Sequence, residues 1–549
     1  MRLLGPLALF AFGLLLRLLF QAATPDGGVG WHVGFQGDAP AWQDLAARLA
    51  QGVPDVELTL PLRPPGMIQG LAWLWNGEGA TVGPVRLLFV VLGAATAPLL
   101  WLLLRPLVPA SVAWLAAILC AASTNLLLLS SGLHVETPYL AGTLLALLAQ
   151  RGLAGERPAR AAIGCGLLHG LLCLLRAEHL VVAVALAAVA LATGARWRPL
   201  LLAALAMAAP IAPWQLHVNQ QVALANGGAP PLPPTAVVWE DDALAALRAL
   251  PGFAQLRVHR FVSATLQVRG RDRVAAADLA IVCEAFGCTP EPLRPSFVAL
   301  QGAFSFWLAC SPESQGGHSR LCLDRPPPLL GGDARYPPGA RDDRPRGGAF
   351  RLDYPPHLDV FVHGYARGVA ELAADPAGAL RRLWQKACYA AAGLTGGLGG
   401  AALPIGLSGE RPAVDMVLAT GGWATAWRAL VLALALTGLW RLRAVRGLWP
   451  LYMFAAIRLL LVAAFFGHAR HGALALPVVA LGVAAAAHAL AVRTGRARWL
   501  PWTAAGLAAL LLAVELWRAR GVDVRFDGRP FTQAPAGVAD HGPHAITFH

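Results

Sequence analysis

Acids, histidines and arginines collect in three short turns between long apolar segments, and these side chains could do chemistry at a membrane surface. They are His134, Glu136, Arg176, Glu178, His468, Arg470 and His471. Ionisable groups beside a lipid phase are costly to desolvate, so clusters of them indicate function. A carboxylate could accept the proton of an attacking hydroxyl group, and arginines could stabilise charge on a leaving phosphate. The combination suits group transfer on a phosphate-bearing lipid.

The loop after the first apolar segment holds a further acid, Asp38. It precedes a short amphipathic segment that carries Leu45 and Leu49 on one side, so its carboxylate could cap a helix N-terminus. The same carboxylate could instead act as a general base at the edge of a membrane cavity. Further along this loop, Arg63 precedes Pro64-Pro65 and an apolar segment with tryptophans, which suits an interfacial helix. We count Arg63 among the candidate substrate-binding residues.

Each turn also has a plainer interpretation. His134 could be a general acid or a metal ligand, but a histidine in a turn could equally be hydrated. Arg176 could simply pair with Glu178, or it could bind a phosphate through its planar fork of donors. Arg470 could be a solvated arginine at a helix end, or the partner of an anionic headgroup. The residue types alone leave these alternatives open.

Several reaction classes lack support in the sequence. It has no Walker loop, no H-E-x-x-H motif and no G-x-S-x-G motif in a supporting context. Nucleotide hydrolysis, zincin chemistry and serine-hydrolase chemistry are therefore not predicted. No residue is assigned as a metal ligand, and no cofactor is certain, although a divalent cation stays open.

Composition places the chain in a membrane. Hydrophobic residues make up 56% of it and charged residues 14%, against about 25% charged residues in soluble proteins. The net charge of +13 could suggest nucleic acid as a partner, but it is almost all arginine, with Lys386 as the single lysine. Much of this charge lies in short loops between apolar segments, which is the positive-inside pattern and not a basic groove.

The alternation of apolar segments predicts an all-α polytopic membrane protein with about eleven transmembrane helices and an extracytoplasmic loop region of mixed structure. The expected spans are 3–22, 82–104, 109–130, 134–149, 160–175, 178–194, 198–216, 424–440, 448–467, 472–492 and 499–517. With a cytoplasmic N-terminus, the short outer turns hold only Arg176 and Arg470. The short inner loops then hold Arg105, Arg151, Arg157, Arg160, Arg196, Arg198, Arg441, Arg443, Arg446, Arg493, Arg496 and Arg498. This asymmetry predicts the orientation.

The topology divides the chain into four parts. They are an N-terminal transmembrane module 1–216 with an outer loop 24–81, an extracytoplasmic region 217–423 with interfacial helices, C-terminal helices 424–517 and an extracytoplasmic tail 518–549. Within 217–423, helices are expected at 241–250, 272–286 and 357–386. The same region holds four cysteines, Cys283, Cys288, Cys310 and Cys322. In an oxidising compartment they could form two disulfides, and their spacing lacks the paired C-x2-C of common zinc modules.

Taken in order, these motifs resemble the membrane-embedded glycosyltransferases of the GT-C type. This group includes the protein O-mannosyltransferases and the bacterial aminoarabinose transferases of lipid A. The residues that carry the resemblance are Arg17, Gly37-Asp38, Pro64-Pro65, Arg86, Glu136-Thr137, Leu175 to Glu178, Asp375-Pro376, and Arg470-His471 with Pro477. The chain departs from the group where Glu136-Thr137 replaces the more usual Thr-Glu order, and where Pro40 and Trp42 stand near Asp38.

The resemblance implies a GT-C-like fold and a glycosyltransferase of the bacterial cell envelope, in the inner (plasma) membrane. The donor would be a sugar linked to polyprenyl phosphate, and the acceptor a lipid, a glycan or a protein. Asp38 would be the catalytic acid/base, and Arg176 and Arg470 would contact the donor phosphate. The remaining candidate substrate-binding residues are Arg63, His134, Glu136, Glu178, His468 and His471.

Two other classes of function compete with this one. A transporter or flippase of a lipid-linked glycan would use the same arginines to hold a phosphate headgroup, but the sequence shows no internal repeat. A membrane scaffold that binds a partner through its large outer region would leave the clustered acids and arginines unexplained.

Overall fold

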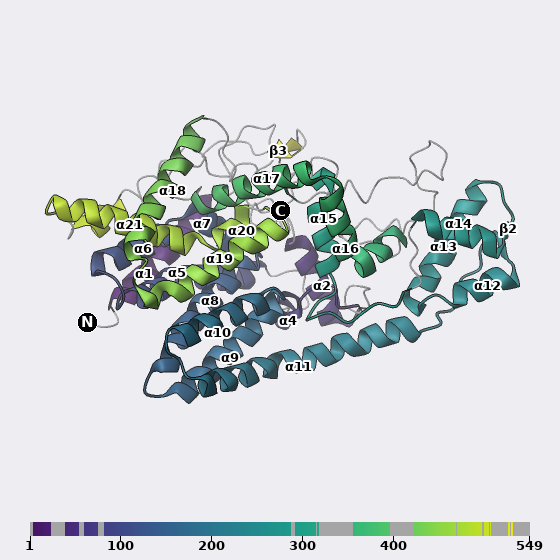
Figure 1. The fold of residues 1–549 in the computed structure, drawn as a ribbon, viewed down its shortest axis with the longest axis horizontal. Helices are drawn as coiled ribbons and strands as arrows, with labels where there is room; N and C mark the ends of the chain where they lie inside the picture. Colours follow the sequence, from purple (N-terminus) through teal and green to yellow (C-terminus); the bar gives the residue numbers. More distant parts are fainter. Residues whose placement is uncertain are drawn as a thin grey trace. The chain divides into compact units, whose positions relative to one another are not determined.

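The computed structural model of this chain consists of helices with a few very short strands (Figure 1). The structure describes residues 4–23, 39–53, 60–74, 82–286, 291–314, 316–317, 355–395, 422–467, 469–496, 499–503, 505–506, 525–526 and 529–530. The chain divides into two compact units. Unit 1 comprises Met1–Val53, Pro64–Ala212 and Trp384–His549, and unit 2 comprises Pro54–Arg63 and Pro213–Leu383.

Seven helices in the described part of the chain are long and apolar enough to cross a membrane. They are α1 (Leu4–Ala23), α5 (Val82–Leu104), α9 (Pro158–Leu175), α11 (Trp197–Gly227), α18 (Gly422–Leu442), α19 (Trp449–Ala464) and α21 (Leu476–Arg493). The predicted class, an all-α polytopic membrane protein, is confirmed. The count of about eleven stays a prediction, because α8 (Glu136–Arg151) and α10 (His179–Ala192) are shorter and 499–517 lies largely outside the described residues.

The expected span 109–130 is broken into two helices. α6 (Ala110–Ala121) and α7 (Thr124–Ser131) are bent by 49° and would form an eighth span if counted together. Polar residues interrupt the apolar run at the break, where Asn125 donates to the Gly393 carbonyl at 2.7 Å. From the other side, Arg17 of α1 donates to the Ala121 carbonyl at the end of α6, at 3.5 Å. The break therefore occurs where polar residues interrupt the apolar run and side chains bond to neighbouring helices.

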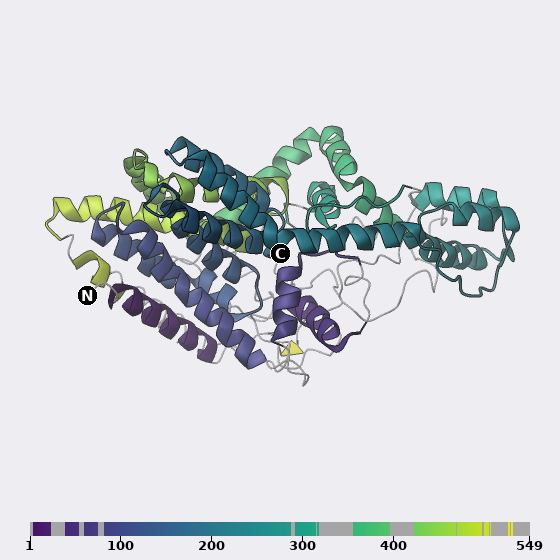
Figure 2. The same cartoon turned by 90° about the horizontal axis from the view of Figure 1, so that it is seen from below.

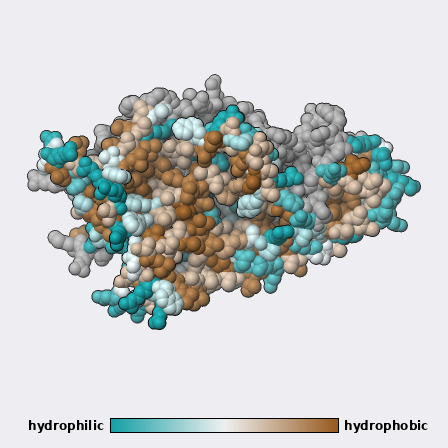
Figure 3. Space-filling view, viewed as in Figure 1, coloured by the Kyte–Doolittle hydropathy of each residue, from teal (hydrophilic) through white to brown (hydrophobic). Residues whose placement is uncertain are grey.

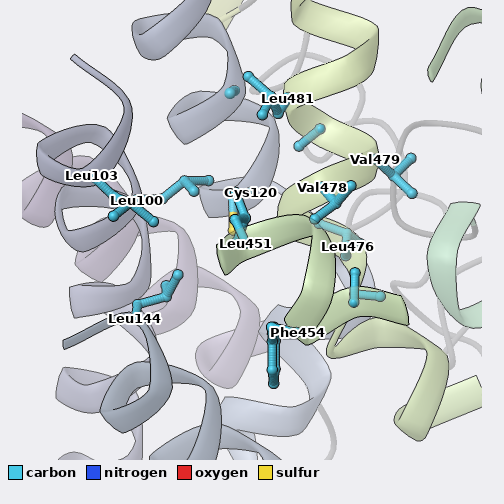
Figure 4. Close-up of a cluster of buried hydrophobic side chains, with 14 of the residues drawn as sticks. Leu100, Leu103, Cys120, Leu144, Leu451, Phe454, Leu476, Val478, Val479 and Leu481 are labelled. Carbon is cyan, nitrogen blue, oxygen red and sulfur yellow. The ribbon is translucent and has the colours of Figure 1, made fainter. Parts of the chain in front are cut away.

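The core of unit 1 is a cluster of buried hydrophobic side chains, many of them from α5, α6, α8, α19 and α21 (Figure 4). It includes Leu100, Leu103, Cys120, Leu144, Leu451, Phe454, Leu476 and Leu481. α18 packs closely on α21. The two backbones approach so closely at Gly438 and Gly482 that a Cβ atom on either glycine would collide with the other helix. Small residues let membrane helices approach closely enough for extensive van der Waals contact.

Leucines cover much of the outside of the helices in unit 1. α1 and α5 lie along each other, as Figure 2 shows for the purple and blue-purple helices near the N-terminus. Their outward faces carry Leu15, Leu18 and Leu87, all exposed. Figure 3 shows apolar side chains over a large part of one face of the molecule. Such a surface suits lipid as solvent.

Short helices and turns complete unit 1. α2 (Ala39–Gln51) buries Trp42, Leu45 and Ala46, so the amphipathic helix expected after Asp38 is present. α4 (Pro65–Trp73) follows the Pro-Pro turn and packs against α9. α20 (Ala469–Ala473) precedes α21. Single 3-10 turns lie at η2 (Gly152–Ala154) and η8 (Arg446–Leu448).

Unit 2 contains helices and one small parallel sheet. β1 (Val238–Trp239) pairs with β2 (Arg273–Val274), with Val238 opposite Arg273. The helices are α12 (Asp241–Arg248), α13 (Gly252–Val268), α14 (Ala276–Phe286), α15 (Gly302–Cys310), η3 (Pro312–Ser314), α16 (Pro355–Ala374) and the first part of α17 (Pro376–Thr395). The helices expected at 241–250, 272–286 and 357–386 are thus found, with a break at Asp375.

Some sequence predictions fall on parts that the structure describes incompletely. α11 continues to Gly227, beyond the expected end of its span at 216. Cys288 and Cys322 lie outside the described residues, so the two disulfides stay a prediction. Near the C-terminus, β3 (Arg525–Phe526) pairs antiparallel with β4 (Arg529–Pro530).

Candidate functional site

Helix ends in unit 1 bring acids and arginines into one cluster. Glu136 is the first residue of α8, Arg176 is the C-cap residue of α9, and Glu178 is the N-cap residue of α10. Each charge suits its helix end, because the helix dipole favours anions at the N-terminus and cations at the C-terminus. The local sequence therefore predisposes these turns to hold opposite charges close together.

Arg176 is the centre of this cluster. Its Nη1 donates to Glu136 Oε1 at 2.8 Å, and its Nε donates to Glu178 Oε1 at 2.6 Å. Its Nη2 lies 3.1 Å from His471 Nε2. Arg176 thus uses all three guanidinium nitrogens on partners from three different turns. The sequence left open whether it pairs with Glu178, and the structure shows that it does.

α20 adds two residues on the other side of Glu136. Arg470 Nε lies 3.7 Å from Glu136 Oε1, and His471 Nε2 lies 3.6 Å from the same oxygen. Glu136 itself is 1% exposed. α20 lies close to α17 at Gly472. A Cβ atom at this position would collide with the Ala390 carbonyl oxygen, so only glycine permits the approach. These contacts join the second and third turns, which lie almost three hundred residues apart, to the first.

Arg458 is a member of the cluster that the sequence analysis missed. It lies in the middle of α19, is 2% exposed, and donates from Nη1 to Glu178 Oε1 at 3.2 Å. One carboxylate oxygen of Glu178 therefore accepts from both Arg176 and Arg458. The signal was present in the sequence, because an arginine within an apolar span is by default a candidate functional residue.

A second set of residues that the sequence analysis did not single out lies next to the arginines. The Tyr139 ring faces two guanidinium groups, with its centroid 5.6 Å from Arg176 Cζ and 5.4 Å from Arg458 Cζ. The Tyr139 hydroxyl bonds to His179 Nδ1 at 2.8 Å, and His179 Nε2 bonds to His169 Nδ1 at 2.8 Å. Tyr139 and His179 are fully buried.

The cluster carries more positive than negative charge. Burial raises the pKa of Glu178, but the guanidinium groups of Arg176 and Arg458 outweigh it and lower that pKa to about 2. Burial, together with Arg176 and Arg470, lowers the pKa of His471 well below its ordinary value of 6.5, so this ring is neutral at pH 7. Among the described residues of the cluster, three guanidinium groups against two carboxylates leave one positive charge in excess. An anion is the ligand that such a site can attract.

The remaining predicted site residues are placed as follows. His134 is buried, two residues before Glu136, and its carbonyl accepts from the Thr137 N–H at 3.0 Å. Arg63 is buried in unit 2, immediately before the Pro-Pro turn. Asp38 and His468 lie outside the described residues. Among the residues that the structure describes, no group of three or more His, Cys, Asp or Glu side chains could hold a metal ion.

The fold and the cluster define a class: an all-α polytopic membrane protein with a buried acid–arginine cluster at its helix ends. No protein-family model and no curated protein matches the chain. Two solved structures of archaeal oligosaccharyltransferase from Archaeoglobus fulgidus are similar to it.

The first is AglB in complex with an inhibitory peptide and a dolichol-phosphate, with 13% identity, a TM-score of 0.41 and coverage of 94% of this chain and 55% of that one. The second is the apo form of the Archaeoglobus fulgidus oligosaccharyltransferase, with 14% identity, a TM-score of 0.42 and coverage of 95% and 57%. The chain spans little more than half the length of these structures.

Proposed function

We propose that this protein is a glycosyltransferase that moves a sugar from a polyprenyl-phosphate-linked donor to an acceptor at the outer face of the bacterial inner membrane. The observation that carries the proposal is the cluster of Arg176, Arg458 and Arg470 around two carboxylates, with one positive charge in excess among the described residues. Planar guanidinium groups match the oxygens of a phosphate, and burial strengthens their attraction for it.

In this proposal Asp38 removes the proton from a hydroxyl group of the acceptor. The acceptor oxygen attacks the anomeric carbon of the sugar, and the bond between that carbon and the donor phosphate oxygen breaks. The polyprenyl phosphate leaves with the electron pair of that bond, and the arginines stabilise the charge that develops on it. Glu136 and Glu178 keep the guanidinium groups in place between turnovers.

Other candidates contribute to substrate binding in the same proposal. His134, His468 and His471 lie in the turns that contribute Glu136 and Arg470, and Arg63 belongs to the first outer loop. The acceptor is a lipid, a glycan or a protein whose hydroxyl or amine can reach Asp38. The resemblance to GT-C enzymes supports the donor class, and the excess positive charge supports a phosphate as the leaving group.

Replacing Asp38 with asparagine tests the catalytic assignment. Asp38→Asn is expected to abolish sugar transfer from radiolabelled polyprenyl phosphate sugars in reconstituted vesicles, because the amide cannot accept the proton. The matched control is Asp44→Asn in α2, whose carboxylate is half-exposed and pairs with Arg48 one turn away. The control is expected to keep its activity. Full transfer by the Asp38→Asn protein would remove Asp38 from the mechanism.

A transporter or flippase of a lipid-linked glycan is the second candidate. The break between α6 and α7 favours it, because transporters often build their sites from discontinuous helices. The same vesicle assay separates the two functions. Labelled donor that crosses the bilayer without forming a glycosylated product would support the transporter, and product formed without crossing supports the enzyme.

A further inference from the structure

Beside the arginines lies a chain of three polar side chains for which the proposed reaction has no direct use. We name His169, His179 and Tyr139 the histidine–tyrosine chain. His169 comes from α9, His179 is the first residue of α10 and Tyr139 is in the first turns of α8. All three are more than nine-tenths buried. Buried polar groups are expensive unless they bond to one another, so a chain of this kind needs an explanation.

The bonds of the chain have a preferred direction. In a bond between two imidazole nitrogens, one nitrogen donates a hydrogen and the other accepts it. If the Tyr139 hydroxyl donates to His179 Nδ1, then His179 Nε2 donates to His169 Nδ1, and every hydrogen in these two bonds has an acceptor. In the reverse direction the Tyr139 hydroxyl hydrogen would need another acceptor, and the guanidinium groups of Arg176 and Arg458 that face the ring can only donate. The first direction is the one in which these three side chains satisfy one another's hydrogen bonds.

The Tyr139 ring links the two histidines of the chain to the arginines. Arg176 and Arg458 both lie within 6 Å of its centroid and bond to the same oxygen of Glu178. Two like charges held this close repel each other, and the ring face attracts both of them. His179 also packs edge-on against Tyr139 at 5.3 Å, and His169 stacks on His179 at 5.1 Å. The ring therefore has a fixed orientation.

We propose that His169 and His179 are positioning residues: they fix the Tyr139 ring and, through it, the spacing of the Arg176 and Arg458 guanidinium groups that bind the donor phosphate. This inference rests on the proposed function, since it assigns the arginines to the donor. Neither histidine contacts the reacting atoms in this arrangement. Disturbing the chain should weaken the contacts of Arg176 and Arg458 with the phosphate, both in the bound donor and in the leaving polyprenyl phosphate.

Two substitutions at His169 test the proposal. An asparagine side chain at this position would place an amide oxygen where Nδ1 accepts now, so His169→Asn keeps the acceptor, whereas His169→Leu removes it. For His169→Leu we expect a KM for the donor raised about tenfold, together with a lower kcat, because the same arginines stabilise the leaving phosphate. His169→Asn should recover most of the wild-type KM. Leucine is the better helix former of the two, so a purely local effect on α9 would produce the opposite ranking.

The control removes a histidine bond of the same length outside the cluster. His488 Nδ1 lies 2.8 Å from Ser111 Oγ, and His488→Leu is expected to leave the donor KM unchanged. The binding of polyprenyl phosphate without sugar provides a second measurement, in which the dissociation constants should rank as the KM values do.

The outcomes separate this inference from the proposed function. If wild-type protein neither transfers sugar nor binds polyprenyl phosphate, the proposed function fails. If wild-type protein does both and His169→Leu has the wild-type KM, only the positioning role fails. A loss confined to kcat, or the same KM for the leucine and asparagine variants, would also overturn the positioning role.

Discussion

At the scale of single residues, Glu178 determines whether the arginine cluster can exist. One of its oxygens accepts from Arg176 at 2.6 Å and from Arg458 at 3.2 Å. Without that negative charge the two guanidinium groups, both within 6 Å of the Tyr139 centroid, would repel each other with no carboxylate to bridge them. Removing one partner from a buried ion pair is strongly destabilising, because the remaining charge is left uncompensated.

Glu178→Gln is therefore expected to lower the free energy of unfolding by about 2 kcal/mol. This lies below the ~3–5 kcal/mol of a fully buried pair, because 30% of the Glu178 side chain is exposed and water screens part of the interaction. Chemical denaturation in detergent micelles measures the effect, with Glu156→Gln in an exposed loop as the matched control. Equal stability of the two variants would contradict the bridging role of Glu178.

The lowered pKa of Glu178 also predicts a dependence on pH. A carboxyl group whose pKa is lower in the folded protein stabilises the fold above its unfolded pKa, and this contribution is lost as the pH falls through the folded pKa. For Glu178 the window runs from about 4.5 down to about 2. Within it, the unfolding temperature of the wild type should fall more steeply than that of Glu178→Gln. Parallel curves would contradict the assignment.

At the scale of elements, close helix packing at a glycine positions two residues of the cluster. α20 brings Arg470 and His471 to Glu136, and Gly472 in the same helix leaves room only for the Ala390 carbonyl of α17. A side chain there would push α20 away from α17 and change the distance from Arg470 to Glu136. The geometry of the third turn is thus set by a contact between backbones.

Gly472→Ala is expected to lower the stability by about 1–3 kcal/mol, the usual cost of overpacking, and to lower transfer activity with it. The matched control is Gly164→Ala in α9, where an added Cβ atom would meet nothing within 4 Å. That substitution should be neutral or slightly stabilising, because alanine is the better helix former. Thermal unfolding of both variants measures the difference, and a stable, fully active Gly472→Ala protein would show that α20 tolerates movement.

At the scale of the whole molecule, the distribution of arginines predicts which ends of the helices face the cytoplasm. Arg176 and Arg470 are the only arginines in the predicted short outer turns, where the positive-inside rule disfavours them. Both belong to the cluster, where carboxylates accompany them. An arginine whose charge is paired with a buried carboxylate has less effect on which side of the membrane its loop lies. The exceptions to the charge rule thus coincide with the candidate site.

Labelling of single cysteines tests this orientation. In a background without native cysteines, a maleimide that cannot cross the membrane should label Gln51→Cys in right-side-out vesicles, because α2 belongs to the predicted outer loop. Glu156→Cys, in the predicted inner loop 150–159, should react only after the vesicles are opened. The reverse pattern would invert the topology and place the cluster on the cytoplasmic side.

Part of the fold and of the site could be predicted without tertiary structure. Long apolar segments indicate membrane helices from composition alone, since lipid leaves the backbone few other ways to satisfy its hydrogen bonds. The turns with Glu136, Arg176 and Arg470 could be identified because ionisable residues are rare at membrane depth and arginine is disfavoured in short outer turns. The break after Ala121 was not predicted, although Ser123, Thr124 and Asn125 interrupt the apolar run, because the contacts of Asn125 and Arg17 that accompany it depend on neighbouring helices.

The sequence by itself determined that this is a membrane protein, and it identified the polar turns in which a lipid phosphate could be handled. Only the tertiary structure decided which of these residues meet. It joined Glu136 to Arg176 and His471, and it added Tyr139 and Arg458, an arginine within an apolar span that had not been assigned to the site. The physical reason is that a contact across hundreds of residues depends on how helices pack against one another, and residue type and local periodicity do not specify that packing.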